Sequence, residues 1–207
     1  QYSALEESRA DLVALYFLPD PKLAEFGLVP VEHHNEIVLA GYESYARNAI
    51  TQLRRVRKGT QLEEDHMRNR QMIVRWLMDN TNAIEERVHN SKTFYVITDV
   101  TVFQQGVGEL LAEAQRIKSE GDYEAAKWLF ETYGIHFDAD LRDQVVERVD
   151  ALNLPSYSGF VQPKLEVERD ANNTIIDVTI SYPKDLMTQM LEYSGNAVGM
   201  VRPGGLH

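Results

Sequence analysis

Apolar residues recur at helical spacing along most of this 207-residue chain. The first such run covers residues 5–18 and stops at Pro19-Asp20-Pro21, because proline cannot continue a helix. The same spacing predicts further helices over residues 36–58, 60–79, 100–119, 122–133, 138–152 and 183–193. The pattern therefore predicts a mainly α protein.

Local signals mark several of these helix ends. Thr60 and Glu63 have the spacing of a capping box, so we expect a helix to begin at Thr60. Asp138 is a favourable N-cap residue for the helix after it. Glycine is favoured just beyond a helix C-terminus, and three glycines are expected there: Gly59, Gly121 and Gly134.

Two parts of the chain have β character. Residues 93–97 are β-branched and aromatic, which favours a short strand. Residues 164–169 and 174–182 alternate in the manner of strands, and the polar residues 170–173 supply a turn between them. The sequence thus predicts a small β-hairpin near the C-terminus. Residues 195–207 are rich in glycine and lack periodicity, so we expect a disordered tail there.

The charge balance excludes some partners. The formal net charge is -11, whereas nucleic-acid binding needs a basic face. The only basic cluster, Arg54, Arg55, Arg57 and Lys58, falls at the expected end of a helix, where cations complement the helix dipole. No apolar run reaches the ~18 residues of a membrane span. We therefore expect neither a nucleic-acid nor a membrane partner, and a cytoplasmic protein, or a periplasmic one if a signal precedes Gln1.

Three carboxylates lie within two turns of the first predicted helix: Glu6, Glu7 and Asp11. Glu7 and Asp11 are four residues apart and share a face that continues into apolar positions. Buried carboxylates need cations, hydrogen bonds or a metal, and because the chain has no cysteine, a metal would be bound by His, Asp or Glu. An alternative is structural: Ser3 and Glu6 have capping-box spacing, and the acids would then stabilise the first turn.

A second candidate pair lies one helical turn apart. His66 and Arg70 share the face that leads to Ile73, Val74 and Leu77, so both are expected to point inward. The structural alternative is a partly buried histidine beside Asp65 and an arginine in an ion pair. The pattern alone leaves both interpretations open.

The segment Glu6-Glu7-Ser8-Arg9-Ala10-Asp11 resembles the second signature motif of the dipeptidyl-peptidase III family, Glu-Glu-(Cys, Ser or Ala)-Arg-Ala-(Glu or Asp). His66-Met67 followed by Arg70 resembles a downstream His-Met-x-x-Arg motif of that family. The similarity extends over about residues 2–193, including 116–123 and 159–163, and is greatest to the bacterial branch. The order and spacing of both motifs make the resemblance specific.

The resemblance implies a function for each of these residues. Glu7 corresponds to the third zinc ligand, and Glu6 and Asp11 to acids that orient two histidine ligands. His66 corresponds to a residue that stabilises the transition state, and Arg70 to one in the substrate cleft. A metal-bound imidazole commonly donates its other N–H to a carboxylate, and two histidines, one glutamate and a water form a usual catalytic zinc site.

One family motif does not occur in this chain. The first signature, His-Glu-x-x-x-His, supplies two zinc ligands and the general base, and nothing like it occurs here. The only close histidine pair, His33-His34, follows Pro30 without a suitably placed glutamate, and we expect it to be exposed. We therefore expect residues 1–194 to be the C-terminal part of a metallopeptidase catalytic domain, inactive alone and binding no zinc by itself.

The resemblance implies that the intact enzyme contains zinc and releases dipeptides from the N-termini of peptides. Its expected partners are the peptide substrate and the missing N-terminal portion of the same protein. Two other functions stay open. The chain could be a non-catalytic helical binding or assembly module, or an unrelated helical protein. In the last case Glu7, Asp11 and His66 would not lie together.

Overall fold

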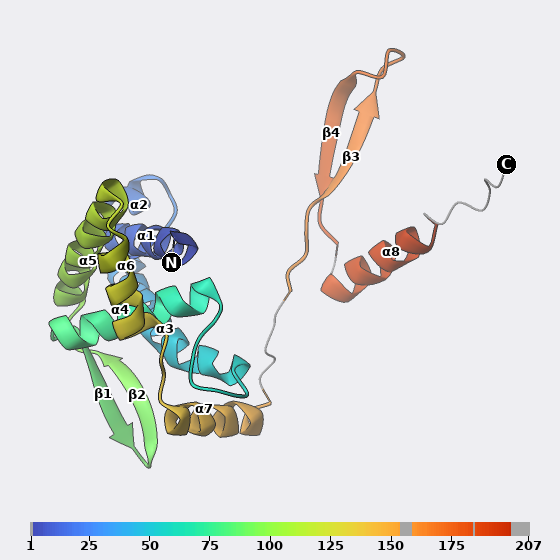
Figure 1. The fold of residues 1–207 in the computed structure, drawn as a ribbon. Helices are drawn as coiled ribbons and strands as arrows, with labels where there is room; N and C mark the ends of the chain where they lie inside the picture. Colours follow the sequence, from blue (N-terminus) through green and yellow to red (C-terminus); the bar gives the residue numbers. More distant parts are fainter. Residues whose placement is uncertain (1, 154–158, 184, 200–207) are drawn as a thin grey trace. The chain divides into compact units, whose positions relative to one another are not determined.

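The computed structural model describes residues 2–153, 159–183 and 185–199. The chain divides into two units, Gln1–Leu154 and Pro155–His207, and Figure 1 shows the elements of each. The first unit is helical apart from one hairpin, and the second contains a hairpin and a helix. The prediction of a mainly α protein with a small β-hairpin near the C-terminus is confirmed. No helix among the described residues is long and apolar enough to cross a membrane.

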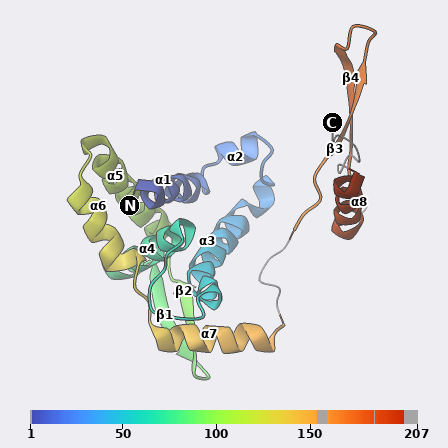
Figure 2. The same cartoon turned by 45° about the vertical axis from the view of Figure 1, so that its right-hand side comes forward.

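Helices α1, α3, α4 and α5 surround the core of the first unit (Figures 1 and 2). They span Tyr2–Phe17, His34–Thr51, Asp65–Asn80 and Val100–Glu120. Each carries buried residues at helical spacing, because one face of each helix packs inward. At the centre Tyr42 stacks on Phe103 with ring centroids 4.0 Å apart, and its hydroxyl donates to the carbonyl of Leu15 at 3.0 Å.

Several helix ends follow the local signals. Asp99 caps α5 by accepting hydrogen bonds from two backbone N–H groups, and Gly121 ends it with a φ of 67°. Asp122 caps α6, Tyr123–Leu129, which continues as a π-helical turn over Phe130–Gly134. Asp138 caps α7, Ala139–Ala151, as predicted.

The segment between α3 and α4 differs from the prediction. Helix α3 ends at Thr51, and a 3-10 helix, Gln52–Arg55, follows before Val56 becomes extended. Gly59, although its φ is 76°, therefore lies in a loop and not at a helix end. Helix α4 starts at Asp65, because the side chain of Glu64 accepts hydrogen bonds from two backbone N–H groups. The predicted capping box of Thr60 and Glu63 is wrong.

The residues before α4 instead form extended contacts with the chain after α6. The backbone N–H of Leu62 donates to the carbonyl of Ile135 at 2.8 Å, and that of Phe137 to the carbonyl of Thr60 at 3.1 Å. Arg54 and Arg55 end the 3-10 helix. Arg57 lies beyond it and pairs with Asp150 of α7 at 3.4 Å.

Further elements of the first unit were not predicted, among them a 3-10 helix over Val31–His33. Strand β1, Ile84–His89, pairs antiparallel with β2, Lys92–Ile97, whereas only the second was expected. The two strands are joined by Asn90 and Ser91, both with positive φ, as a tight hairpin turn requires. A short helix α2, Lys22–Glu25, follows Pro21.

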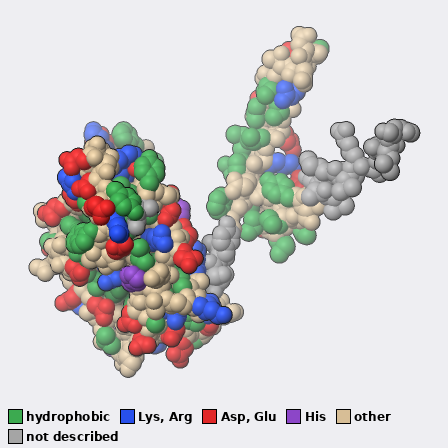
Figure 3. Space-filling model, in the orientation of Figure 1, with side chains coloured by type: hydrophobic (Ala, Val, Ile, Leu, Met, Phe, Trp, Pro, Cys, Tyr) green, Lys and Arg blue, Asp and Glu red, His purple; other side chains and the backbone are tan. Residues whose placement is uncertain are grey.

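The second unit contains the predicted C-terminal hairpin. Strands β3, Lys164–Arg169, and β4, Ile175–Ser181, pair antiparallel. Helix α8, Leu186–Gly199, extends beyond its predicted end at residue 193. The remaining tail, residues 200–207, lies outside the described residues. Apolar side chains of this unit are exposed, including Val167, Ile180 and Leu191 (Figure 3).

Candidate functional site

Glu7 and His66 meet where α1 packs against α4. The Glu7 Oε2 atom lies 3.2 Å from His66 Nδ1. The side chain of Glu7 keeps 37% of its surface exposed and that of His66 keeps 60%. The two residues come from separate motifs, and the packing of α1 on α4 brings them together. A carboxylate and an imidazole thus lie side by side in contact with solvent.

Asp11 lies one turn further along α1 and also faces α4. Its Oδ2 atom accepts a hydrogen bond from the hydroxyl of Tyr45 at 2.8 Å and another from Asn69 Nδ2 at 3.1 Å. Burial, and then the charge of Asp11, raise the pKa of Tyr45 well above its usual range, so its hydroxyl remains a donor at neutral pH. Neutral groups therefore fix Asp11, and its Oδ1 atom has no hydrogen bond to the described residues.

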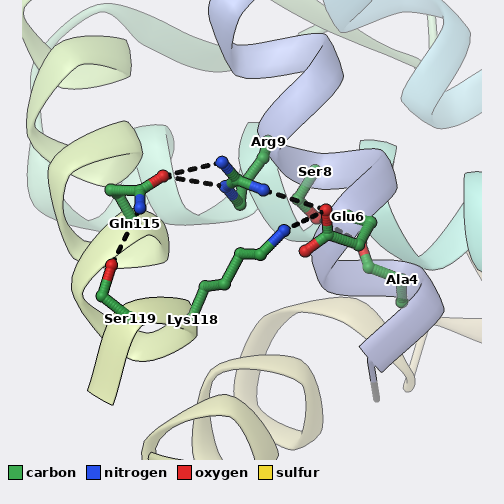
Figure 4. A network of polar contacts seen from close by, with 7 residues as sticks. All are labelled: Ala4, Glu6, Ser8, Arg9, Gln115, Lys118 and Ser119. Atoms are coloured by element: carbon green, nitrogen blue, oxygen red, sulfur yellow. Dashed lines mark hydrogen bonds and ion pairs between the residues drawn. The ribbon is translucent and has the colours of Figure 1, made fainter. Parts of the chain in front are cut away.

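Glu6 points to the other side of α1, toward α5 (Figure 4). Its Oε2 atom accepts hydrogen bonds from Lys118 Nζ at 2.7 Å and Arg9 Nη1 at 2.9 Å. The hydrogen bond from Lys118 is the largest cause of a lowered pKa of Glu6, and the positive charge of Arg9 adds to it. Its Oε1 atom is buried and accepts no hydrogen bond from the described residues. One oxygen of Glu6 thus fixes the side chain and the other is an unused acceptor.

The structural alternative for these acids does not fit the start of α1. Ser3 lies inside the helix, which already includes Tyr2, so Ser3 is not the N-cap residue and does not form a capping box with Glu6. Arg9 adds a second connection between α1 and α5, because its Nε and Nη2 atoms donate to Gln115 Oε1 at 3.1 and 2.7 Å. Glu6 therefore belongs to a network between two helices (Figure 4).

Arg70 is held by a buried glutamine. Its Nη1 atom donates to Gln52 Oε1 at 2.8 Å, while Gln52 Nε2 donates to the carbonyl of Met67 at 3.0 Å. The guanidinium carbon of Arg70 also lies 6.0 Å from the centroid of the Tyr45 ring. Gln52 is neutral, so it holds Arg70 in place without compensating its charge. Arg70 forms no ion pair with any described residue, whereas the structural alternative expected one.

His66 and Arg70 line a groove of about 1050 Å³. Its other walls come from α3 and the 3-10 helix after it, from β2 and from α7. Glu6, Glu7 and Asp11 are not among the lining residues. The structure thus places the histidine and the arginine at the groove, and Glu7 beside the histidine.

Within the part of the chain that the structure describes, no group of three His, Asp or Glu residues could hold a metal ion. Glu7 has only His66 beside it, and Glu6 points toward cations. His33 is exposed, as expected, and lies 3.8 Å from Glu36. His34 departs from the expectation: it is half-buried, because its Nε2 atom lies 2.8 Å from the carbonyl oxygen of Leu18.

Sequence reasoning missed three polar residues that fix the site: Tyr45, Gln52 and Asn69. Asn69 is fully buried and Gln52 is 6% exposed. Tyr45 lies on α3, Gln52 on the 3-10 helix after it and Asn69 on α4. A buried polar group must find a hydrogen-bond partner, but the sequence does not indicate which residue each one contacts.

The chain was compared with known proteins. The model of peptidase family M49 matches residues 2–184. No curated protein matches the chain. The match includes both motifs and every site residue described above, and it covers most of the chain. The chain belongs to peptidase family M49.

Proposed function

We propose that this chain supplies part of the active site of a zinc-dependent exopeptidase of the dipeptidyl-peptidase III type, which releases dipeptides from the N-termini of peptides. The observation that carries the proposal is the contact between Glu7 and His66, 3.2 Å apart on α1 and α4. These residues belong to the two motifs that resemble those of this family, and an unrelated helical protein would have no reason to bring them together.

Three carboxylate oxygens of α1 that form no bond to a lysine or arginine among the described residues support this proposal. Glu7 presents a partly exposed carboxylate with no lysine or arginine within ion-pair distance among the described residues, so it is available as one zinc ligand. Glu6 Oε1 and Asp11 Oδ1 are acceptors without partners in the described chain. Each could accept a hydrogen bond from the N–H of a zinc-bound histidine, which orients the ring.

His66 and Arg70 would act on the peptide. A zinc ion at such a site lowers the pKa of a bound water and polarises the peptide carbonyl. An imidazole N–H of His66 would donate a hydrogen bond to the oxygen of that carbonyl as negative charge develops. Arg70, held in place by Gln52, would contact the substrate in the groove.

The described residues supply only part of this site. Glu7 is one ligand, no group of three ligands is found among them, and the sequence contains no His-Glu-x-x-x-His. We infer that two histidine ligands and the general base come from a segment of the same protein outside this sequence. A single carboxylate does not retain zinc, so the chain alone would be inactive. The motifs are most similar to those of the bacterial branch.

The test uses the longer protein that includes the upstream segment. Glu7→Gln should abolish zinc-dependent release of dipeptides from a tetrapeptide, because an amide is a poor zinc ligand. Glu25→Gln, at an exposed glutamate of α2, is the matched control and should keep full activity. Full activity of Glu7→Gln would refute the proposal. A longer protein without His-Glu-x-x-x-His would instead favour a non-catalytic binding or assembly module.

A further inference from the structure

The groove beside His66 has a charge opposite to that of the chain. Its lining includes five arginines and two glutamates, Glu43 and Glu64, whereas the whole chain has a formal net charge of -11. The arginines are Arg47, Arg54, Arg55, Arg70 and Arg148. Cations gathered in a concave, low-dielectric site focus the electrostatic field there. The groove is therefore a positive region on an acidic protein.

Three arginines of this groove differ from others of the chain in their partners. Six arginines elsewhere lie within 4.0 Å of a carboxylate: Arg9, Arg57, Arg68, Arg87, Arg116 and Arg142. In the groove, Arg47 donates to Ser44 Oγ at 3.1 Å and Arg148 to the carbonyl of Thr93 at 2.9 Å. Arg70 likewise donates to an amide oxygen, that of Gln52. These three contact neutral oxygens and keep their charge uncompensated by the described residues.

The two acids of the groove are fewer than its arginines. The carboxylate of Glu64 accepts the backbone N–H groups of His66 and Met67 at 3.0 Å each, which caps α4 and leaves its negative charge in place. Glu43 is exposed and has no hydrogen bond or ion pair within the described ranges. Arg55 is exposed as well and forms no hydrogen bond or ion pair with another described residue. Net positive charge thus remains for a ligand.

The shape and the other walls indicate what kind of anion fits. The groove measures about 1050 Å³, far more than a single small anion needs, and pockets of this size bind extended organic ligands. Apolar side chains of β2 and α7 also line it, among them Phe94, Val145 and Leu152. A ligand that fits has carboxylates and apolar groups along one length, as an acidic peptide does.

We propose that this groove binds the acidic side chains of the peptide substrate, so that the enzyme prefers peptides with Asp or Glu beyond the cleaved bond. This inference rests on the proposed peptidase function. His66 and Arg70 line the same groove, so a peptide bound there contacts the proposed catalytic histidine. Arg47, Arg55 and Arg148 would pair with the carboxylates of the substrate.

The test measures binding and needs no catalysis. A fluorescently labelled eight-residue peptide with several Glu residues is titrated with this chain by anisotropy, beside the same peptide with Gln at those positions. The Glu peptide should bind at least about tenfold more tightly at low salt, and the difference should fall as salt screens the charges. Arg47→Gln and Arg55→Gln should each weaken its binding about threefold to fivefold.

Arg87→Gln is the matched control, because Arg87 is exposed on β1, pairs with Glu85 and does not line the groove. Equal binding of the two peptides, or an equal loss in Arg87→Gln, would overturn the inference. So would full displacement by inorganic phosphate at constant ionic strength, which would indicate a site for small anions. The Glu peptide could bind the chain while the longer protein shows no zinc-dependent hydrolysis. That result would support the binding of acidic peptides in the groove and refute only the proposed function.

Discussion

Helix α1 packs against α5 and α4, and its carboxylates have different hydrogen-bond partners on each side. Toward α5, Glu6 is held by the cations Lys118 and Arg9 (Figure 4). Toward α4, Asp11 is held by the neutral groups of Tyr45 and Asn69, and Glu7 lies beside His66. Opposite charges on the first side contribute to stability, whereas on the second side the negative charge is kept in place without being neutralised.

This difference decides which carboxylate oxygens are available to a ligand, because cations engage Glu6 Oε2 and leave Glu6 Oε1 without a partner among the described residues. A carboxylate paired with lysine or arginine is a weak ligand, because a metal or an N–H donor must compete with the cation. A carboxylate that is held by a hydroxyl and an amide, as Asp11 is, stays uncompensated and can bind an incoming cation or hydrogen-bond donor. The same contrast occurs among the arginines, since Arg47, Arg70 and Arg148 of the groove contact neutral oxygens.

The largest expected effect comes from adding a charge on the α4 side. Asn69→Asp should place a second carboxylate against Asp11, where Asn69 Nδ2 now donates at 3.1 Å. Like charges without a cation should lower the free energy of unfolding by about 3 kcal/mol at neutral pH. The loss should shrink at acid pH as the pair takes up a proton. Chemical denaturation at several pH values measures it.

Asn80→Asp is the control for this change, because it adds the same charge at an exposed position of the same helix, where Asn80 Nδ2 donates to the carbonyl of Trp76. Its loss should stay below about 1 kcal/mol. An equal loss in both variants would show that Asp11 is not an uncompensated charge, and the contrast between the two sides of α1 would fail.

A smaller effect is expected on the α5 side. Lys118→Met removes the cation that contributes most to the lowered pKa of Glu6. A carboxyl whose pKa is lowered in the folded state stabilises the protein above its unfolded pKa, and this contribution is lost as the pH falls through the folded pKa. Lys118→Met should therefore be less stable than the natural chain at pH 7, with the difference vanishing well below a pH of about 4.5. Unchanged pH dependence would contradict the assignment.

The smallest effect on stability is expected at Glu7. The pair of Glu7 and His66 is 37% and 60% exposed, and exposed pairs contribute little to stability. Glu7→Gln should change the free energy of unfolding by less than about 0.5 kcal/mol, measured by urea denaturation of this chain. A loss larger than that of Lys118→Met would show that Glu7 holds the fold.

Local signals predicted the helix ends that local residues determine. Gly121 and Asp138 act on the backbone within a few residues of themselves, so the sequence is enough to place them. The capping box predicted at Thr60 and Glu63 does not form, because the chain before α4 pairs with Ile135 and Phe137, far away in the sequence. Strand β1 was missed for a different reason, because its partner β2 follows after only two residues and its own charged sequence, Ile-Glu-Glu-Arg-Val-His, lacks the β-branched and aromatic character of β2.

The candidate site shows the same limit. The two motifs identified Glu7, His66 and Arg70 as candidates, and the structure adds how they are held. Asn69 follows His66 by three residues, yet its contact with Asp11 depends on how α4 packs against α1. Gln52 contacts Arg70 across the turn between α3 and α4, which periodicity within either helix cannot predict. Residues that act through neighbours are found only once the packing is known.

Both tryptophans of the chain, Trp76 and Trp128, lie in the first of its two units. The second unit therefore contributes nothing to intrinsic tryptophan emission. Trp76 lies on α4, the helix that carries His66 and Arg70, so a fluorescence signal follows the environment of that helix. Far-ultraviolet circular dichroism reports on the backbone of both units, so a change that it detects without a change in tryptophan emission is consistent with an event in the second unit.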